Sequence, residues 1–426
     1  MNAPMLKAEL AEHSVIEDLF ARLRALSSDG VGISRVAYSD KESEALDLIE
    51  NEAKRLSLAV ERDQAANLVA TLPGTDKALP FIACGSHLDS VPRGGNYDGA
   101  AGVVAALMVL ARFKRGNFQP RRSVKLFALR GEESARFGKA YLGSSCLFGK
   151  LKRADLGVLA ENDGRSLAAC MSDVGVNVDK VASGEILLDP TTVAAWIELH
   201  IEQGPILEAR DLPIGIVTGI RGNIKHRAIE CRGEAGHSGA VPRWLRRDAV
   251  FGMCELIANL DSHWRTLLER GHDLVLTSGI VSTDKNSNAI TRIPETVRFA
   301  MEIRSQSKET LDSAYELLQA ECAAVSRERG VSFHFDQKIE AEGATMDASW
   351  VQRLGDAANR LQLRWEPIAS GGGHDAAVFA NAGVPSAMVF VRNQNGSHNP
   401  REAMNIPDLI AGIDVMHASI LEAAML

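Results

Sequence analysis

Three polar side chains that suit a metal site lie close together near the start of the chain. His87 and Asp89 follow an apolar run, 79–84, that is typical of a buried strand, and Asp98 comes after a glycine-rich segment. In an extended backbone alternate residues point to the same side, so His87 and Asp89 should project together. One of them can bind an ion while the other holds it in place. The stretch therefore predicts part of a metal centre.

Further candidate ligands occur at three other places in the chain. Glu132 and Glu133 follow another short apolar strand, 123–129, while His200 and His398 stand in later motifs. Imidazole and carboxylate ligands without thiolate suit Zn, Mn, Co or Ni at a hydrolytic site better than a structural zinc. Five such groups exceed what one catalytic zinc needs, whereas two ions sharing a carboxylate would use them all. We predict two divalent ions, preferably zinc, held by His87, Asp98, Glu133, His200 and His398.

Composition limits the class of protein. The chain has 426 residues, of which 46% are hydrophobic, so it can bury a large core and is long enough for two domains. Its formal charge is −8 and charges of both signs are interspersed, which predicts neither nucleic-acid nor membrane binding. A small polar molecule is the expected partner.

Cysteine usage and the N-terminus bear on the compartment. The six cysteines are widely scattered and include no Cys-x-x-Cys pair, so a disulfide framework is not expected. The first 26 residues carry charges throughout, and no uncharged apolar run approaches the roughly 18 residues of a membrane span. We therefore expect a cytoplasmic protein.

The pattern of apolar residues predicts an α/β core in the first part of the chain. Strands and helices alternate, and a parallel sheet built in this way collects functional groups at the carboxyl ends of its strands. His87 and the pair Glu132-Glu133 both fall at such ends. The expected helices are 44–58 and 99–113, and the expected strands are 67–72, 79–84 and 123–129.

A second pattern runs from about residue 214 to residue 342. Its elements follow the order βαββαβ, which is the ferredoxin-like order. The expected strands are 223–232, 274–281, 297–304 and 331–339, and the expected helices are 244–270 and 308–329. The α/β pattern resumes with 350–361 and 387–391. We predict a catalytic domain of residues 1–213 and 343–426, interrupted by a smaller domain of residues 214–342.

Eight motifs, in this order, resemble one known family. They are His87-x-Asp89 with Gly-Gly-Asn-Tyr-Asp98-Gly, Glu132-Glu133, Glu-Leu-His200-Ile-Glu-Gln203-Gly-Pro, Gly-His237-Ser-Gly, Ser-Asn288-Ala-Ile, Arg304, Gly-Gly373-His374-Asp375-Ala and Ser-His398-Asn-Pro. Together they look like the M20 family of metal-dependent amidohydrolases. Within it they resemble the carbamoylase branch: N-carbamoyl-L-amino acid hydrolases, β-ureidopropionase and allantoate amidohydrolase. The resemblance runs from about residue 15 to the C-terminus.

The resemblance implies a role for each residue of the metal centre. Asp98 would bridge the two ions, with His87 and His200 completing one and Glu133 and His398 the other. Asp89 would orient His87 through the hydrogen bond that fixes its tautomer. Glu132 would be the general base, which takes a proton from water and returns it to the departing nitrogen.

The resemblance also implies how a substrate is held. Arg304 and Asn288 would bind its carboxylate, His237 would stabilise the oxyanion, and Gln203 with the backbone near Gly373 would line the carbamoyl pocket. In this family the inserted domain acts as a lid and forms the dimer contact, so a homodimer is expected, in which lid residues act in their own subunit or across the interface. Whether His374 and Asp375 support the site or only pack near it is open at this point.

The implied activity is hydrolysis of the carbamoyl (ureido) C–N bond of N-carbamoyl-L-amino acids or related ureido acids, releasing ammonia and CO2. Two loops depart from the branch pattern: Ser238–Arg243 replaces Thr-Thr-Pro-Met, and the loop at Asn395–His398 is one residue shorter. They bear on the choice of substrate more than on hydrolysis. The alternatives are an allantoate amidohydrolase, a dipeptidase or aminoacylase of the same family, and a metal-binding protein without turnover. The last has no need of Glu132 beside a full ligand set.

Overall fold

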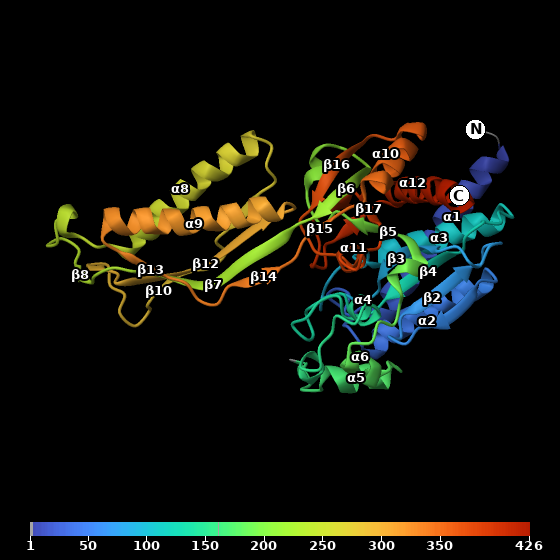
Figure 1. The fold of residues 1–426 in the computed structure, drawn as a ribbon, viewed down its shortest axis with the longest axis horizontal. Helices are drawn as coiled ribbons and strands as arrows, with labels where there is room; N and C mark the ends of the chain where they lie inside the picture. The colour runs from blue at the N-terminus through green and yellow to red at the C-terminus, as the bar shows by residue number, and fades with distance from the viewer. Residues whose placement is uncertain (1–2, 161) are drawn as a thin grey trace. The chain divides into compact units, whose positions relative to one another are not determined.

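The computed structural model describes residues 3–160 and 162–426, and the chain forms two compact units (Figure 1). Unit 1 comprises the chain up to Thr218 together with Thr345–Leu426, and unit 2 is Gly219–Ala344. The boundaries lie a few residues after those predicted from the sequence. The reason is strand β6 (Ile214–Ile220), which pairs with β17 (Ser386–Val391) and so belongs largely to the sheet of unit 1.

Unit 1 is built on one mixed sheet of nine strands. Their order is β1-β2-β4-β3-β5-β17-β6-β15, with β16 paired to β6. The four central strands, β4, β3, β5 and β17, run parallel. This confirms the predicted α/β class with a mixed sheet. The remaining bounds are β1 Ala59–Arg62, β2 Leu68–Leu72, β3 Phe81–His87, β4 Val124–Leu129, β5 Val193–Ile201, β15 Ala344–Thr345 and β16 Trp365–Ser370.

Helices cover both faces of this sheet, as the alternation of side chains along β5 shows. Ile197, Leu199 and Ile201 pack in the core with α3 (Ala100–Arg115). On the other face Trp196 stacks on Phe379 of α11 (Asp375–Ala380), with ring centroids 3.9 Å apart. His200 therefore points to the α11 side, because alternate residues of a strand share a face.

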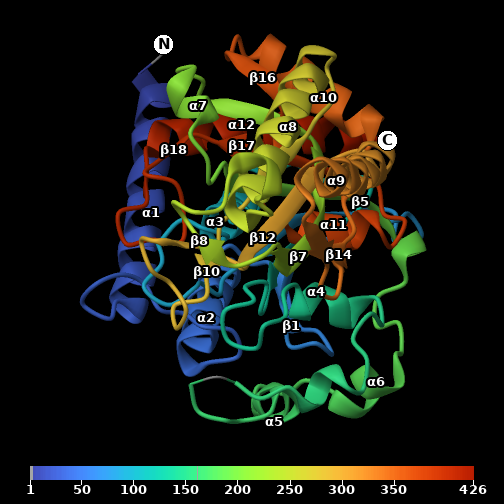
Figure 2. The same cartoon turned by 90° about the vertical axis from the view of Figure 1, so that its left-hand side faces the viewer.

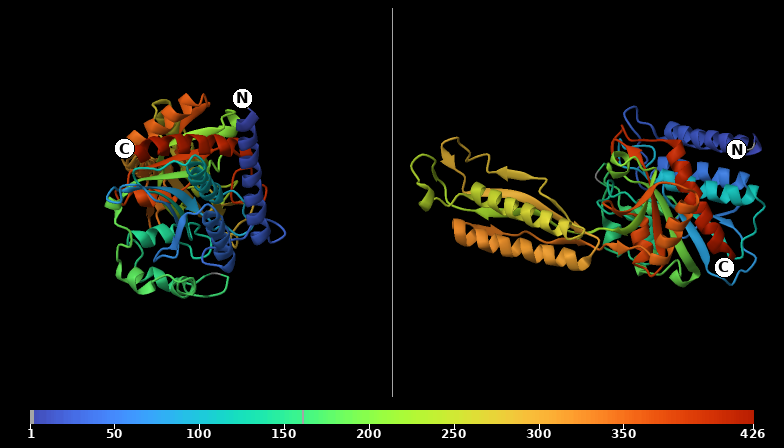
Figure 3. Two further views of the ribbon diagram at one scale, coloured as in Figure 1. Left: turned by 90° about the vertical axis from the view of Figure 1, so that its right-hand side faces the viewer. Right: turned by 90° about the horizontal axis from the view of Figure 1, so that it is seen from above.

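The longer helices of unit 1 surround α3. Helix α12 (Ile406–Met425) packs against α3, α10 (Ala348–Arg360) and α1 (Ala3–Ser27), as Figure 3 shows. Helix α2 (Asp40–Arg55) contacts α1. Between β4 and β5 the chain forms short helices, with α5 and α6 side by side in Figure 2: α4 Leu142–Leu147, α5 Leu167–Asp173 and α6 Val178–Ser183. Among the described residues, no helix is both apolar and long enough for a membrane span.

Unit 2 has an antiparallel sheet in the order β10-β12-β7-β13, with β9 beside β12 and β14 beside β7. Helices α8 and α9 lie on the same face of it, over a common apolar core (Figure 1). Along the chain this is βαββαβ. The bounds are β7 Gly222–Arg232, α8 Ala249–Glu269, β9 Val275–Thr277, β10 Val281–Thr283, β12 Thr296–Ser305, α9 Lys308–Arg329, β13 Ser332–His334 and β14 Ile339–Ala341.

Two elements of unit 2 differ from the predicted ones. Helix α8 begins at Ala249 and not at residue 244, because the Asp248 carboxylate caps it by accepting from the backbone N–H groups of Val250 and Phe251. The predicted strand 274–281 is divided into β9 and β10, because the pairing register of β12 shifts between Phe299 and Met301. Such a bulge interrupts the ladder on its neighbours.

Candidate metal centre

The five predicted ligands gather at one end of the parallel strands of unit 1. His87 is the last residue of β3, Glu133 follows β4, His200 is near the end of β5, and His398 lies beyond β17. Asp98 stands just before α3. Ligands in open α/β sheets bind outside the carboxyl ends of the strands, so the topology alone brings these distant parts of the chain together.

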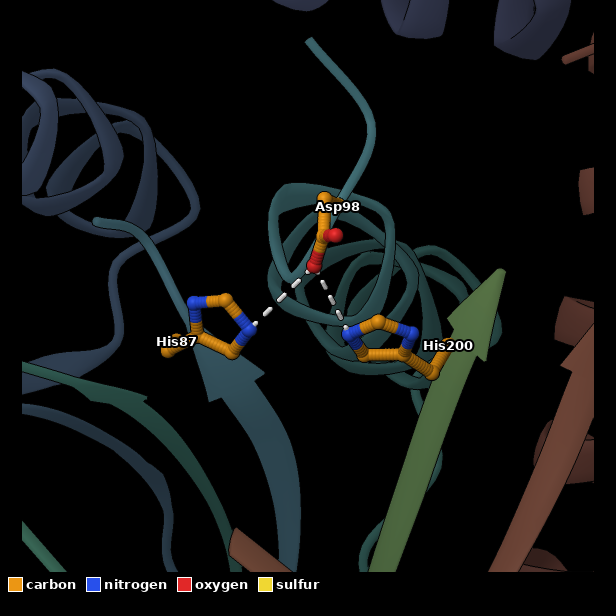
Figure 4. Close-up of side chains that lie close together, drawn as sticks. All are labelled: His87, Asp98 and His200. Atoms are coloured by element: carbon orange, nitrogen blue, oxygen red, sulfur yellow. Dashed lines mark ion pairs between the residues drawn. The ribbon is translucent and has the colours of Figure 1, made fainter. Parts of the chain in front are cut away.

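His87, Asp98 and His200 form a first group that could hold an ion (Figure 4). The Asp98 Oδ1 atom lies 3.5 Å from His87 Nε2 and 3.2 Å from His200 Nε2. All three side chains are buried. In Figure 4 both imidazoles point at the carboxylate, which is the arrangement needed for ligands of one cation.

Asp98, Glu133 and His398 form a second group. His398 Nε2 lies 3.1 Å from Glu133 Oε1 and 3.4 Å from Asp98 Oδ2, and its side chain is half exposed. Within each group the ligand atoms lie within 4.8 Å of one another. Because the two groups share Asp98, this carboxylate stands where a bridge between two ions would be.

The donor set fits divalent cations. Two buried carboxylate oxygens, Asp98 Oδ1 and Glu133 Oε1, accept no hydrogen bond from any described residue, although each lies close to an imidazole nitrogen. A buried acceptor without a donor is costly unless a cation or water meets it. The donor set has imidazole nitrogens and carboxylate oxygens and contains no thiolate, which is typical of catalytic zinc and related metals.

Hydrogen bonds fix the two buried imidazoles. His87 Nδ1 is 3.1 Å from the Asp89 carbonyl oxygen and 3.3 Å from its carboxylate, and His200 Nδ1 is 2.8 Å from the Ile201 carbonyl oxygen. A carbonyl can only accept, so Nδ1 carries the proton in each ring and Nε2 is left with its lone pair toward Asp98. The sequence predicted this orienting role for the Asp89 carboxylate, and the Asp89 backbone shares it.

The Asp89 carboxylate has a second task. Its two oxygens accept from the backbone N–H groups of Glu132 and Glu133, each at 2.9 Å. Asp89 thus ties the end of β3 to the turn after β4. The placement of both glutamates depends on this one buried side chain.

Mutual electrostatics are strong in this cluster. Burial alone would raise the pKa of Asp98, but the three neighbouring histidines hold it well below its usual value. Asp98 and Glu133 raise the pKa of His398 to about 10. Burial raises the pKa of Glu132 well above its usual value, against the opposing effect of His87, and Glu133 adds to the rise. Glu132 is therefore a carboxyl group that holds a proton readily, 3.9 Å from His87 Nε2.

Sequence reasoning missed Glu402. This buried carboxylate accepts from the backbone N–H groups of Tyr97 at 2.8 Å and Asp98 at 3.2 Å, and from the Ser397 hydroxyl at 2.8 Å. Ser397 also donates to Asp98 Oδ2. Glu402 thereby joins the Asp98 loop to the His398 loop. The available signal was an acidic residue four positions after His398, which by itself does not reveal that it is buried.

His374 and Asp375, left open by the sequence, lie against the centre. The His374 ring is 4.4 Å from that of His200, and burial lowers its pKa well below the usual value, so it is neutral. Asp375 accepts from the Ser144 hydroxyl at 2.5 Å. Beside it Glu198 accepts from Ser86 at 2.7 Å and from the Ala376 N–H at 2.8 Å. These bonds fasten β3, β5 and α11 behind the ligands.

The two residues predicted to line the carbamoyl pocket in unit 1 lie nearby. Gln203 adopts a φ of 62° and donates from Nε2 to Asp98 Oδ2 at 2.8 Å. A Cβ atom on Gly373 would stand 1.6 Å from the Tyr141 hydroxyl, so only glycine allows this close approach. Both findings leave the substrate roles of Gln203 and Gly373 as predictions.

The remaining predicted residues belong to unit 2, which is described by itself. His237 is exposed and its Nδ1 accepts from the Gly239 N–H at 3.2 Å. Asn288 donates to the Thr283 hydroxyl at 2.7 Å. Arg304 pairs with Glu302 at 2.9 Å. Their roles toward a substrate stay predictions.

We expect Gly99→Ala to weaken metal binding at least tenfold. Gly99 has a φ of 62°, and a Cβ atom there would stand 2.4 Å from His87 Cε1, so the ring must move. Displacing one ligand changes both its distance and its direction to a bound ion. The measurement is metal affinity of the purified variant by chelator competition.

Gly138→Ala is the matched control. Gly138 has a φ of 65°, and a Cβ atom added there would meet no other atom within 4 Å, so this variant shares the backbone strain without the clash. Equal metal affinity in the two variants would show that His87 tolerates the added methyl group.

Comparison with known proteins agrees with this geometry. The model of peptidase family M20/M25/M40 matches residues 83–422. An N-carbamoyl-L-amino-acid amidohydrolase of a Pseudomonas species is 31% identical over 92% of this chain and 93% of its own. Allantoate amidohydrolase of Escherichia coli is 29% identical over 96% of this chain and 97% of its own.

A solved structure gives the same result. An amidase of the hydantoinase/carbamoylase family from Burkholderia multivorans superposes with a TM-score of 0.87 at 27% identity, covering 97% of this chain and 98% of its own. These likenesses confirm the resemblance drawn from the motifs, including its carbamoylase branch. The chain belongs to peptidase family M20/M25/M40.

Proposed function

We propose that the protein hydrolyses the carbamoyl (ureido) C–N bond of N-carbamoyl-L-amino acids or related ureido acids, with two divalent ions per subunit, zinc being the first choice and Mn, Co or Ni the others. The names of its relatives, N-carbamoyl-L-amino-acid and allantoate amidohydrolases, support this substrate class. The observation that carries the proposal is the pair of ligand groups that share Asp98, with Glu132 beside them.

Bound ions of this kind polarise a carbonyl and make a nearby water more acidic. His87, Asp98 and His200 would hold one, and Asp98, Glu133 and His398 the other. Glu132 is then the group that takes the proton of the attacking water and returns it to the departing nitrogen, which suits a carboxyl whose pKa burial has raised. Asp89 keeps Glu132 in place through its backbone N–H.

Substrate recognition completes the proposal. Gln203 and the Gly373 backbone would receive the carbamoyl group, Arg304 and Asn288 the carboxylate, and His237 the oxyanion. Unit 2 would serve as lid and as the contact of a homodimer. The six cysteines are free thiols, which supports a reducing, cytoplasmic location.

Allantoate hydrolysis is the second candidate. The likeness to the Escherichia coli allantoate amidohydrolase extends over nearly the whole chain at an identity close to that of the carbamoylases. Allantoate is also a ureido acid with a carboxylate, so the same groups would serve. The shorter loop before His398 and the sequence after His237 are where this chain differs from the branch pattern.

A substrate panel tests the proposal. The metal-stripped protein is reloaded with Zn, Mn, Co or Ni, and ammonia release is measured with N-carbamoyl amino acids, ureidopropionate and allantoate, while dipeptide cleavage is followed as amino acid released. We expect turnover of at least one ureido acid and none without metal. Cleavage of dipeptides alone would assign the protein to the peptidases of the family instead.

We expect Arg304→Ala to weaken binding of a carboxylate substrate by about 1–3 kcal/mol, the range for charged hydrogen bonds. A guanidinium offers a carboxylate two parallel N–H donors, and alanine offers none. The measurement is KM, or Kd in an inactive background, for the substrate that the panel identifies.

Arg298→Ala is its control. Arg298 lies on the same strand, pairs with Glu230 at 2.7 Å and is 65% exposed, so its removal takes one positive charge from unit 2 without touching Arg304. Unchanged KM in Arg304→Ala, or equal wild-type activity on a carboxyl-amidated substrate, would contradict the assigned role.

A further inference from the structure

Arg35 is a fully buried guanidinium outside the predicted ligand set, 0% exposed. Its Nε donates to the Leu88 carbonyl at 2.8 Å, and its Nη1 donates to Asn96 Oδ1 at 3.3 Å and to the Ser27 hydroxyl at 3.4 Å. Leu88 lies between His87 and Asp89, and Asn96 lies two residues before Asp98. One side chain therefore reaches both of the segments that bring ligands to the first group.

The backbone around Arg35 makes the same connection. Its N–H donates to the Ser90 hydroxyl at 3.0 Å, and the Ser90 N–H donates to its carbonyl at 2.8 Å. Two residues earlier, Ile33 and Gly94 exchange backbone hydrogen bonds of 3.0 and 2.8 Å. The segment from Ile33 to Arg35 is thus bonded to both ends of the loop that runs from His87 to Asp98.

The charge of Arg35 has no close counterpart. No carboxylate of the described residues lies within 4.0 Å of its guanidinium, and its Nη2 has no hydrogen-bond partner among them. Burial lowers its pKa to about 10, while Asp89, Glu402 and Asp98 act to raise it, so it is a cation at neutral pH. A buried cation without a partner is costly, and an apolar side chain would serve the stability of the fold as well or better. The nearby carboxylates are those of the metal centre.

We propose that Arg35 is a positioning residue of the metal centre. It holds the His87–Asp89 and Asn96–Asp98 segments at the separation that ion binding requires. Its charge also offsets the mutual repulsion of Asp89, Asp98 and Glu402 before ions bind. The inference rests on the proposed two-ion function and adds to it a residue that touches neither ion nor substrate.

The test compares Arg35→Met with Arg112→Met in the full chain. Arg112 is a largely buried guanidinium that bonds Glu12 and Asp414 from the last turn of α3, about 18 Å along the helix from its start beside Asp98. Zinc affinity of the metal-stripped proteins is measured by competition with a chromophoric chelator, and the thermal midpoint of each stripped protein is recorded alongside.

We expect Arg35→Met to bind zinc about 10- to 100-fold more weakly, as is usual when a residue that supports a ligand is lost. Arg112→Met should lower the thermal midpoint but keep the wild-type affinity. Arg35→Lys, which keeps the charge but not the planar fork, should recover part of the loss. Wild-type affinity in Arg35→Met, or an equal loss in Arg112→Met, would overturn the inference.

Should Arg35→Met not fold, Arg35→Lys and Ser90→Ala decide. Ser90→Ala removes one bond to the Arg35 backbone and leaves the guanidinium in place. A several-fold loss of zinc affinity in both supports the positioning role, and unchanged affinity in both contradicts it. A wild-type protein that binds no zinc would instead refute the proposed function, so the two failures are distinct.

Discussion

Replacing Glu132 by glutamine is expected to lower kcat by at least about 10²- to 10⁴-fold, the usual contribution of a general base, while both ions stay bound. Glutamine has the shape of glutamate but cannot accept the proton of an attacking water. Glu132 belongs to neither ligand group, and its backbone position is fixed by Asp89 whatever its side chain. The measurements are steady-state kinetics on the substrate found by the panel and elemental analysis of the same sample.

The neighbouring residue supplies the contrast. Glu133→Gln changes the adjacent side chain in the same way, but Glu133 belongs to the second ligand group, so we expect this variant to lose one ion. Loss of metal from Glu132→Gln would mean that Glu132 is a ligand and that the proton acceptor lies elsewhere.

Asp98→Asn should remove more metal than any other single change at the centre. Asp98 is the one residue common to both groups, and all three histidines lie around its two oxygens. An amide carries no charge and presents only one acceptor atom, so neither ion keeps its carboxylate oxygen. We expect affinity for both ions to fall by more than about 100-fold, beyond the range seen when supporting residues are lost. Elemental analysis after gel filtration measures the metal that remains.

His398→Ala separates a shared ligand from an unshared one. His398 belongs to the second group only, and its side chain is half exposed, so its loss leaves His87, Asp98 and His200 intact. One ion per subunit should remain. If Asp98→Asn and His398→Ala both left one ion, the centre would not be bridged by Asp98.

The ligand set could be predicted from the sequence because each member follows a short apolar strand. His87, Glu133 and His200 each stand at or just after the end of a strand that periodicity identifies, and the carboxyl ends of parallel strands share one edge. The motifs then supplied the order. The predicted βαββαβ arrangement of the second unit rested on the same periodicity, and the strands and helices occur in that sequence.

The supporting residues could not be found in this way. Glu402 and Arg35 are charged residues in loops and near element ends, where sequence patterns favour solvent exposure, yet both are buried. What buries them is the packing of segments far apart in the chain: Glu402 bonds to Tyr97 and Asp98, and Arg35 to Leu88 and Asn96. The start of α8 was misplaced for a local reason, since the capping role of Asp248 outweighs the apolar pattern before it.

The position of β17 has a consequence for synthesis of the protein. This strand lies between β5 and β6 in the sheet, although the ribosome makes it after the whole of unit 2. A nascent chain that has emerged as far as β6 therefore exposes an apolar edge on β5 with no neighbour to pair, the kind of edge that invites aggregation. Unit 2 is contiguous in the chain and can complete its own sheet during that interval. Maturation of the main sheet must wait for the final quarter of translation, and chaperone demand should be greatest just before it.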